Sequence, residues 1–192
     1  MSQIKLNATS GGGSVSLQAP SSSSNDRVYT LPDSAHITTL AGILEFDSWY
    51  VTSNLSADGV VTNLARNNFA GAASQIGTGM TESSGVFTFP ETGKYFIITN
   101  AQFAVNGSSN IILYTQVTTN NSSYSNHARA LDGNNGSGER SGSGASFSFI
   151  DVTDTTQVKV RFNLDVITSG DQLAGGTTFQ RTSFTFIRIG DT

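Results

Sequence analysis

The sequence predicts an all-β protein built as a two-sheet sandwich, and three observations lead to this prediction. Short runs rich in Val, Ile, Phe and Thr recur along the chain between Gly, Asn, Asp and Pro, which is the pattern of strands and turns. One of these runs alternates strictly between apolar and polar residues. No long window has the spacing of an amphipathic helix, and the helix formers Lys, Glu, Gln and Met are scarce.

Residues 1–40 differ from the rest, and we interpret them as an extended docking arm. Runs of Gly and Ser separate three strand-like pieces: residues 4–6, 14–19 and 27–32. None is long enough to build its own core, so we expect the arm to add strands and apolar anchors to neighbouring subunits; the alternative is a disordered tail. The anchors are Ile4, Leu6, Val15, Leu17, Val28 and Leu31.

From residue 41 to 192 the strand pattern is continuous and predicts about eight to ten strands in one domain. The expected strands, in chain order, are residues 43–46, 48–51, 60–61, 85–90, 94–105, 111–117, 145–150, 158–166 and the closing stretch from Phe179 to Ile189. Pro90 stops one strand, and the run 94–105 is too rich in aromatic and β-branched residues for a helix. Residues 119–146 are polar and predict a long exposed loop or a pair of irregular edge strands.

The strand at residues 158–166 shows the clearest alternation. Its apolar face comprises Val158, Val160, Phe162, Leu164 and Val166, and its polar face comprises Lys159, Arg161, Asn163 and Asp165. A shift of one residue would bury the charges, so the register of this strand is strongly specified.

The composition excludes several classes of function. The 192 residues contain no cysteine, so the chain has no disulfide, thiolate nucleophile, zinc finger or iron–sulfur cluster. Only 12% of residues are charged, against roughly 25% in an average domain, and the net charge of −4 argues against nucleic acid as a partner. No apolar run approaches the roughly 20 residues that span a bilayer, so we expect no membrane insertion. The first residues show no secretory signal.

Residues with catalytic chemistry are few, and we expect no enzyme activity and no cofactor. His36 and His127 lie in polar surroundings far apart in the sequence, which is typical of solvated surface histidines. Glu45 and Asp47 could share one face of a strand and serve a glycosidase, although carboxylates so close in sequence are usually turn or edge features. Asp151 and Asp154 lie in a predicted turn.

The segment Asp132–Gly136 places oxygen ligands at a calcium-like spacing. It lacks the bidentate Glu and the flanking helices of an EF-hand, so a polar turn is favoured over a metal site.

The stretch Gly85–Phe96 resembles the signature of C1q-like domains, in which Gly-x-Phe-Thr-x-Pro and then Gly-x-Tyr-x-Phe link two adjacent strands. The residues that carry the motif are Phe87, Phe89, Pro90, Gly93, Tyr95 and Phe96. Two departures occur: Asp154–Gln157 replaces a Gly-Asp turn, and Thr185 replaces the glycine of the closing strand. The resemblance implies a C1q/TNF-like jelly-roll sandwich over residues 41–192 that assembles as a homotrimer. Candidates for its core or trimer contacts are Phe162, Phe184, Phe186 and Ile189.

The arm carries a second resemblance. Ile4–Leu6, Gly11–Pro20 and Tyr29–Asp33 are similar to a segment in structural proteins of tailed phages, where it precedes fibre or C1q-like modules. This resemblance implies a non-enzymatic, trimeric phage virion protein, assembled in the host cytoplasm. We expect it to decorate the capsid and to bind capsid or tail subunits through the arm. The alternative is a short head or tail fibre that binds a host-surface glycan, with Tyr124 as the ligand candidate. A ligand-binding module of a cellular, cytokine-like system is a further alternative.

Overall fold

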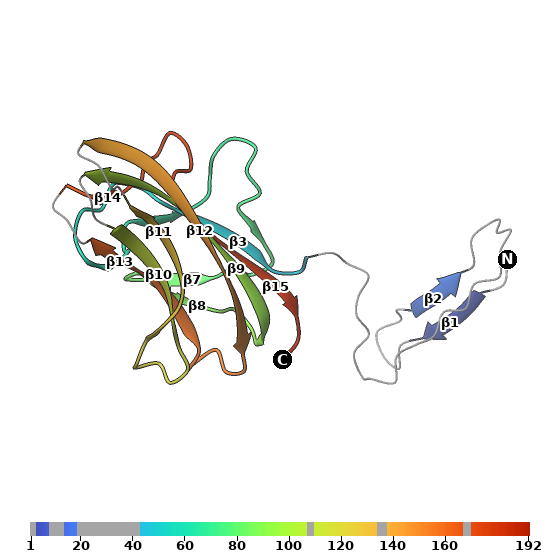
Figure 1. Ribbon diagram of the computed structural model, residues 1–192. Coiled ribbons are helices and arrows are strands. Elements are labelled where there is room, and N and C mark those ends of the chain that lie inside the picture. Colours follow the sequence, from blue (N-terminus) through green and yellow to red (C-terminus); the bar gives the residue numbers. More distant parts are fainter. Residues whose placement is uncertain (1–2, 8–13, 19–42, 107–109, 134–137, 167–169) are drawn as a thin grey trace, which may run out of the picture. The chain divides into compact units, whose positions relative to one another are not determined.

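The computed structural model describes residues 3–7, 14–18, 43–106, 110–133, 138–166 and 170–192 (Figure 1). The chain divides into residues 1–40 and residues 41–192, and each part is described by itself. All regular structure in the described ranges is β-strand, as the sequence predicts. These ranges contain no helix that is long and apolar enough to cross a membrane.

The described part of residues 1–40 is an antiparallel pair of strands. They are β1 (Gln3–Asn7) and β2 (Ser14–Gln18). The register sets apolar positions directly opposite each other: Ile4 with Leu17, and Leu6 with Val15. Two of the three predicted strand-like pieces are therefore strands, and they pair with one another. The third piece, with Val28 and Leu31, lies outside the described residues, as does His36.

One sheet of residues 41–192 has seven strands. Its main path runs β12 (Glu139–Val152), β9 (Gly93–Asn106), β15 (Ser183–Gly190), β3 (Phe46–Val51) and β5 (Leu64–Arg66). Two short strands join it, β14 (Gln172–Leu173) on β9 and β6 (Gln75–Ile76) on β3. The longest pairing joins β12 to β9, and both strands have 14 residues.

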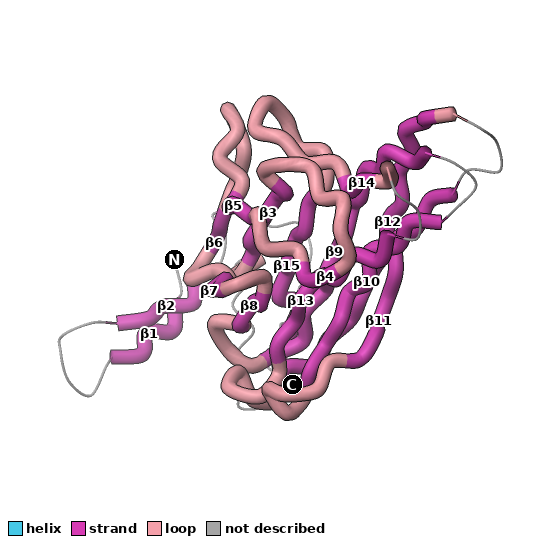
Figure 2. Tube along the Cα trace, turned by 90° about the vertical axis from the view of Figure 1, so that its left-hand side faces the viewer, coloured by secondary structure: helices cyan, strands magenta, loops and turns pink. Residues whose placement is uncertain are grey.

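The other sheet has six strands and packs face to face on the first (Figures 1 and 2). Its path runs β11 (Ser125–Gly133), β10 (Asn110–Thr118), β13 (Lys159–Val166), β8 (Val86–Thr88) and β7 (Thr81–Ser83), with β4 (Gly59–Val60) on β13. Neighbours in each sheet are mostly not consecutive in sequence, so the chain crosses repeatedly between the sheets. This arrangement is the predicted two-sheet jelly roll.

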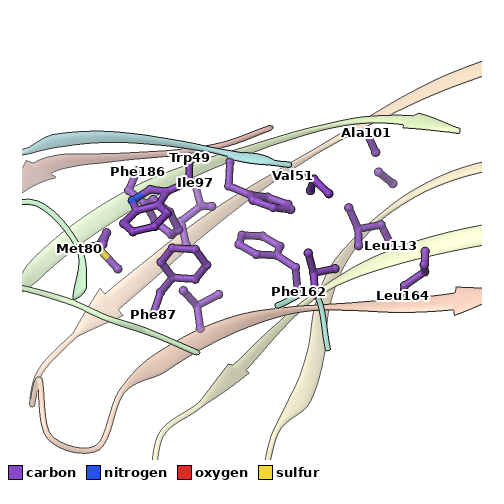
Figure 3. Packing of buried hydrophobic residues seen from close by; sticks show 14 of the residues in the cluster. Trp49, Val51, Met80, Phe87, Ile97, Ala101, Leu113, Phe162, Leu164 and Phe186 are labelled. Carbon is purple, nitrogen blue, oxygen red and sulfur yellow. The ribbon is translucent and has the colours of Figure 1, made fainter. Parts of the chain in front are cut away.

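The core lies between the two sheets and combines aromatic rings with aliphatic side chains (Figure 3). The rings of Phe162 and Phe184 stack with centroids 3.6 Å apart, and Phe87 packs edge-on against Trp49 at 5.3 Å. The predicted alternation on β13 is confirmed, because its apolar residues up to Leu164 are buried and its polar residues lie partly exposed. The side chain of Val166 lies outside the described set.

The motif between β8 and β9 has the expected geometry. β8 ends before Pro90, and Tyr95 enters β9 facing the core with 1% of its surface exposed. Gly93 opens β9 with a φ of 148°. A Cβ atom at this position would come within 2.5 Å of Arg188 Nε and 2.7 Å of Gly190 O, so the close approach of β15 requires glycine here.

Two predictions about elements need correction. Ile43 and Leu44 are exposed and precede the strand, which begins at Phe46 and continues through the second predicted strand. Phe179 is exposed and lies before β15. For residues 119–146 the second alternative is confirmed in the described residues: β11 and the first half of β12 are edge strands, because their backbones pair with β10 and β9, and the β10–β11 register shifts between Thr115 and Gln116. Their polar composition reflects edge exposure.

Candidate functional site

The outer face of the seven-stranded sheet carries an apolar row that crosses five strands. The register sets Phe149 of β12 opposite Phe96 of β9, and Phe96 opposite Ile187 of β15. Ile187 is in turn opposite Phe46 of β3, which is opposite Ile76 of β6. Residues directly opposite in antiparallel strands lie on the same face. We call these five residues the apolar row.

A second pair of apolar residues extends the row by one step along the strands. Phe147 is opposite Ile98. The ring of Phe96 stacks on Phe149 with centroids 4.6 Å apart and lies nearly parallel to Phe147 at 5.9 Å. Phe147 and Phe149 nevertheless remain 60% and 65% exposed. Three phenylalanine rings thus form one surface cluster, and water covers most of its outer side.

The middle of β12 presents aromatic residues to the outer face of the sheet and serines to the core. Phe147 and Phe149 point outward, whereas Ser146 and Ser148 are buried between the sheets. The hydroxyl oxygens of both serines are buried without a hydrogen-bond partner. Pairing with β9 fixes this choice, because Ser148 must lie opposite the buried Ile97. A shift by one residue would bury the phenylalanines, but it would also expose the buried Ile150 and Val152. The native register therefore keeps Ile150 and Val152 in the core and leaves the two phenylalanines on the outer face.

The predicted core or trimer candidates separate into two groups. Phe162, Phe184 and Phe186 are at most 1% exposed and belong to the core between the sheets. Ile189, near the end of β15, is 55% exposed. Phe96 is the motif residue that faces outward, whereas Phe87, Phe89 and Tyr95 are buried.

Asp47 is the more buried member of the predicted carboxylate pair, with 1% of its surface exposed. Its carboxylate accepts two hydrogen bonds from the Arg66 guanidinium, at 2.9 and 3.0 Å, and one from the Met80 backbone N–H at 2.7 Å. Arg66 also donates to Met80 O at 2.8 Å and lies 4.8 Å from the centre of the Trp49 ring. Asp47 therefore joins β3 to the segment before β7.

Glu45 reinforces the same connection. Its two carboxylate oxygens accept the backbone N–H groups of Thr78 and Gly79, each at 2.9 Å. The hollow beside the pair, bounded by Pro90 and Tyr95, is too small to admit a water molecule. Glu45 and Asp47 do lie together, as the sequence suggested, but their oxygens hold the chain and face no substrate cleft.

Tyr124 precedes β11 and is engaged by the neighbouring strands. The Arg161 guanidinium lies 3.9 Å from the centre of its ring and donates from Nε to Gln116 Oε1 at 2.7 Å. Partial burial raises the pKa of Tyr124, and the positive charge of Arg161 opposes this shift. One face of the ring is therefore covered by Arg161. His127 is exposed on β11, apart from these groups.

Of the other predicted polar residues, Asp154 lies outside the strands, whereas Asp151 belongs to β12 and not to the predicted turn, and Asp132 belongs to β11. Asp154 accepts the N–H and hydroxyl of Thr156 at 2.8 and 2.6 Å, and these hydrogen bonds hold its pKa below the usual value. Asp132 Oδ1 accepts the Gly133 N–H at 2.8 Å, and residues 134–136 lie outside the described residues. Across the part of the chain that the structure describes, no three His, Asp or Glu side chains are grouped to hold a metal ion.

A polar depression of about 620 Å³ opens on the seven-stranded sheet. Its lining comes from three stretches of chain: Asn100–Gln102 of β9, Ser141–Ala145 of β12, and Arg181 before β15. No pattern in the sequence indicated this site. The alternation of side chains in β9 predicts that Asn100 and Gln102 share one face of the strand. Only the pairing of β9 with β12 brings them beside residues 141–145.

Comparison with known proteins supports the fold. No family model and no curated protein matches the sequence. Two crystal structures of murine APRIL, at pH 5.0 and pH 8.0, match at TM-scores of 0.54 and 0.55, each with 10% identity over 76% of this chain and 98% of theirs. Eiger TNF from S. frugiperda matches at a TM-score of 0.50, with 12% identity over 77% of this chain and 95% of its own. At these identities the similarity extends to the fold, and the chain has a TNF-like jelly roll.

Proposed function

We propose that this protein is a non-enzymatic structural component of a bacteriophage particle, which assembles as a homotrimer and decorates the outside of the particle. The exposed apolar row is the observation that carries the proposal. Large exposed apolar patches on soluble proteins mark interaction sites. Here the patch is built of stacked rings on a rigid sheet, with Phe147 and Phe149 more than half exposed.

A second copy of the same chain is the partner that this face fits best. The apolar row is bordered by Lys94 and Asp151, which lie opposite each other one step beyond Phe96 and Phe149. A ring of three such faces would bury the phenylalanines around one axis and close the assembly, so that no apolar face stays open. The resemblance to C1q-like domains and the TNF-like fold both favour a threefold arrangement.

Residues 1–40 supply the proposed anchor. In β1 and β2 the apolar positions 4, 6, 15 and 17 are paired across the strands and belong to one face of the hairpin. A two-stranded hairpin is at best marginally stable alone, so its apolar face needs a partner. We propose that capsid or tail subunits supply that partner, with Val28 and Leu31 as further anchors.

The virion location rests on the similarity of residues 4–33 to phage structural proteins. The absence of cysteine suits assembly in a reducing host cytoplasm, because no disulfide is needed. The non-enzymatic role is supported by Glu45 and Asp47, the most plausible catalytic pair by sequence, whose oxygens are bonded to Arg66 and to backbone N–H groups. A short head or tail fibre that binds a host glycan is the second candidate, favoured by the polar depression.

Light scattering at micromolar protein concentration tests the trimer directly: a mass three times that of the 20.2 kDa chain is expected, and a monomer contradicts the proposal. Deletion of residues 1–40 should leave the trimer intact and abolish incorporation into particles. Unchanged incorporation of the deletion variant would show that the arm is not the anchor. Electron microscopy of particles carrying labelled protein then separates the placements, since decoration labels the whole shell and a tail component labels one vertex.

A further inference from the structure

The polar depression on the seven-stranded sheet is complete within one chain. Its outward side chains come from two neighbouring strands, where Ser143 lies directly opposite Gln102 and Ala145 opposite Asn100. Arg181 closes one side. The volume of about 620 Å³ lies within the range of about 300–1,000 Å³ that is typical of small-molecule sites.

The polar side chains of the depression have unused hydrogen-bonding capacity. Among the described residues, no hydrogen bond within the chain involves the side chains that line it: Asn100, Gln102, Ser141, Ser143 and Arg181. By contrast, side-chain amides that stabilise the fold elsewhere in the molecule are hydrogen-bonded within the chain. Asn63, for example, donates to both Ser53 O and Ser53 Oγ. The lining therefore offers amide and hydroxyl groups, one cation and no carboxylate.

The backbone at Arg181 is fixed by the hydrogen bonds of the next residue, Thr182. The hydroxyl of the buried Thr182 donates to Ala174 O at 2.8 Å and accepts the Gln102 N–H at 3.1 Å, while Thr182 O accepts the Val51 N–H at 3.0 Å. These bonds fix the backbone next to Arg181 against β9 and β3. Its guanidinium lies 5.0 Å from the centre of the Phe179 ring, which is itself 54% exposed.

We propose that this depression binds an acidic saccharide, a sugar unit that bears a carboxylate. The guanidinium can hold a carboxylate through two parallel hydrogen bonds. The amides of Asn100 and Gln102 and the serine hydroxyls match sugar hydroxyls, since each can donate or accept. The site is rigid because four of these side chains belong to strands: two amides to β9 and two serines to β12.

Titration calorimetry with the full chain and trigalacturonic acid tests the proposal. Saturable binding is expected, and its methyl ester, which lacks the charges, should bind at least about tenfold more weakly. Absence of binding up to about 10 mM ligand overturns the proposal, as does equal binding of the ester. Sodium acetate is the third ligand: if it competes as well as trigalacturonic acid, the depression is a simple anion site and holds no saccharide.

Two variants localise the binding. Arg181→Gln should weaken binding of trigalacturonic acid about tenfold, whereas Arg129→Gln, which removes an exposed charge from β11 on the other sheet, should leave it unchanged. If both variants weakened binding equally, binding would depend only on the overall charge of the protein, and this result would contradict the proposed site. The site does not depend on the proposed trimer. A monomeric Phe149→Ser variant should still bind, and loss of binding there would contradict a site made by one chain.

Discussion

Phe149 of β12 lies directly opposite Phe96 of β9 on the sheet face that points away from the core, with the two ring centroids 4.6 Å apart. The next residue inward, Ser148, is buried with its hydroxyl unpartnered. On a single chain Phe149 stays 65% exposed. The outward phenylalanines therefore favour an interface that completes the burial in an assembly.

Phe149→Ser should convert the trimer to a monomer. The substitution removes the ring that stacks on Phe96 at the proposed interface, while the single chain stays folded because the site is on the surface. Light scattering measures the mass, and circular dichroism confirms the fold. Phe179→Ser is the matched control, because Phe179 is 54% exposed but lies off the apolar row, and it should remain trimeric. A trimeric Phe149→Ser variant would place the interface elsewhere.

Ser148→Ala should stabilise the folded chain by about 1 kcal/mol. The change removes a buried hydroxyl that has no hydrogen-bond partner, and so removes its desolvation cost. Urea denaturation measures the free energy of unfolding. Ser143→Ala on the exposed face of the same strand serves as the control and should change stability by no more than about 0.5 kcal/mol. A clear loss of stability in Ser148→Ala would show that the hydroxyl is satisfied.

Asp47→Ala should lower the free energy of unfolding by about 2–3 kcal/mol. It leaves the Arg66 guanidinium and the Met80 N–H without their charged acceptor. Asp151→Ala, which changes an exposed carboxylate at the end of β12, should have little effect in the same urea titration. If both variants were equally stable, Asp47 would not hold the segment before β7.

Tyr95 should ionise with a pKa of about 12, above the ordinary value of 10.0. Burial is the main cause, the charges of Glu91 and Glu45 add to it, and Arg188 opposes it. Because the unfolded chain loses this proton at lower pH than the folded chain, Tyr95 lowers stability progressively between pH 10 and about 12. Ultraviolet absorbance titration of the protein and of a Tyr95→Phe variant isolates this group. Ionisation of Tyr95 at its ordinary pKa would contradict the prediction.

Gly144→Val should destabilise the sandwich. A Cβ atom at residue 144 would lie 2.9 Å from both the backbone N and the backbone O of Leu131, so β11 would have to move away from β12. Overpacking of this kind costs about 1–3 kcal/mol. The melting temperature reports the loss, and Ala145→Val is the control because Ala145 is exposed on the outer face. Equal melting temperatures would show that the two edges are not closely packed.

Patterns within a single strand could be predicted from the sequence. The alternation from Val158 to Leu164 sets the buried face of β13, and the run around Pro90 and Gly93 sets the turn between β8 and β9. Both depend on neighbours in sequence: side chains alternate with period two, and proline cannot continue a paired central strand. The all-β sandwich follows from these local signals together with the absence of helical patterns, whereas the jelly roll was expected from the resemblance of Gly85–Phe96 to C1q-like domains.

Only the tertiary structure decided which face of β12 is outward. Alternation assigns Phe147 and Phe149 to one face and Ser146 and Ser148 to the other, but pairing with β9 determines which pair meets the core. The polar depression likewise needs three separate stretches of chain in one register. By itself, then, the sequence determined the all-β class, most of the long strands and the two faces of each predicted strand. The apolar row and the depression were determined by pairing between strands that are far apart in the sequence. Such pairing cannot be predicted from a short stretch of residues, because the contacts that set it join distant parts of the chain.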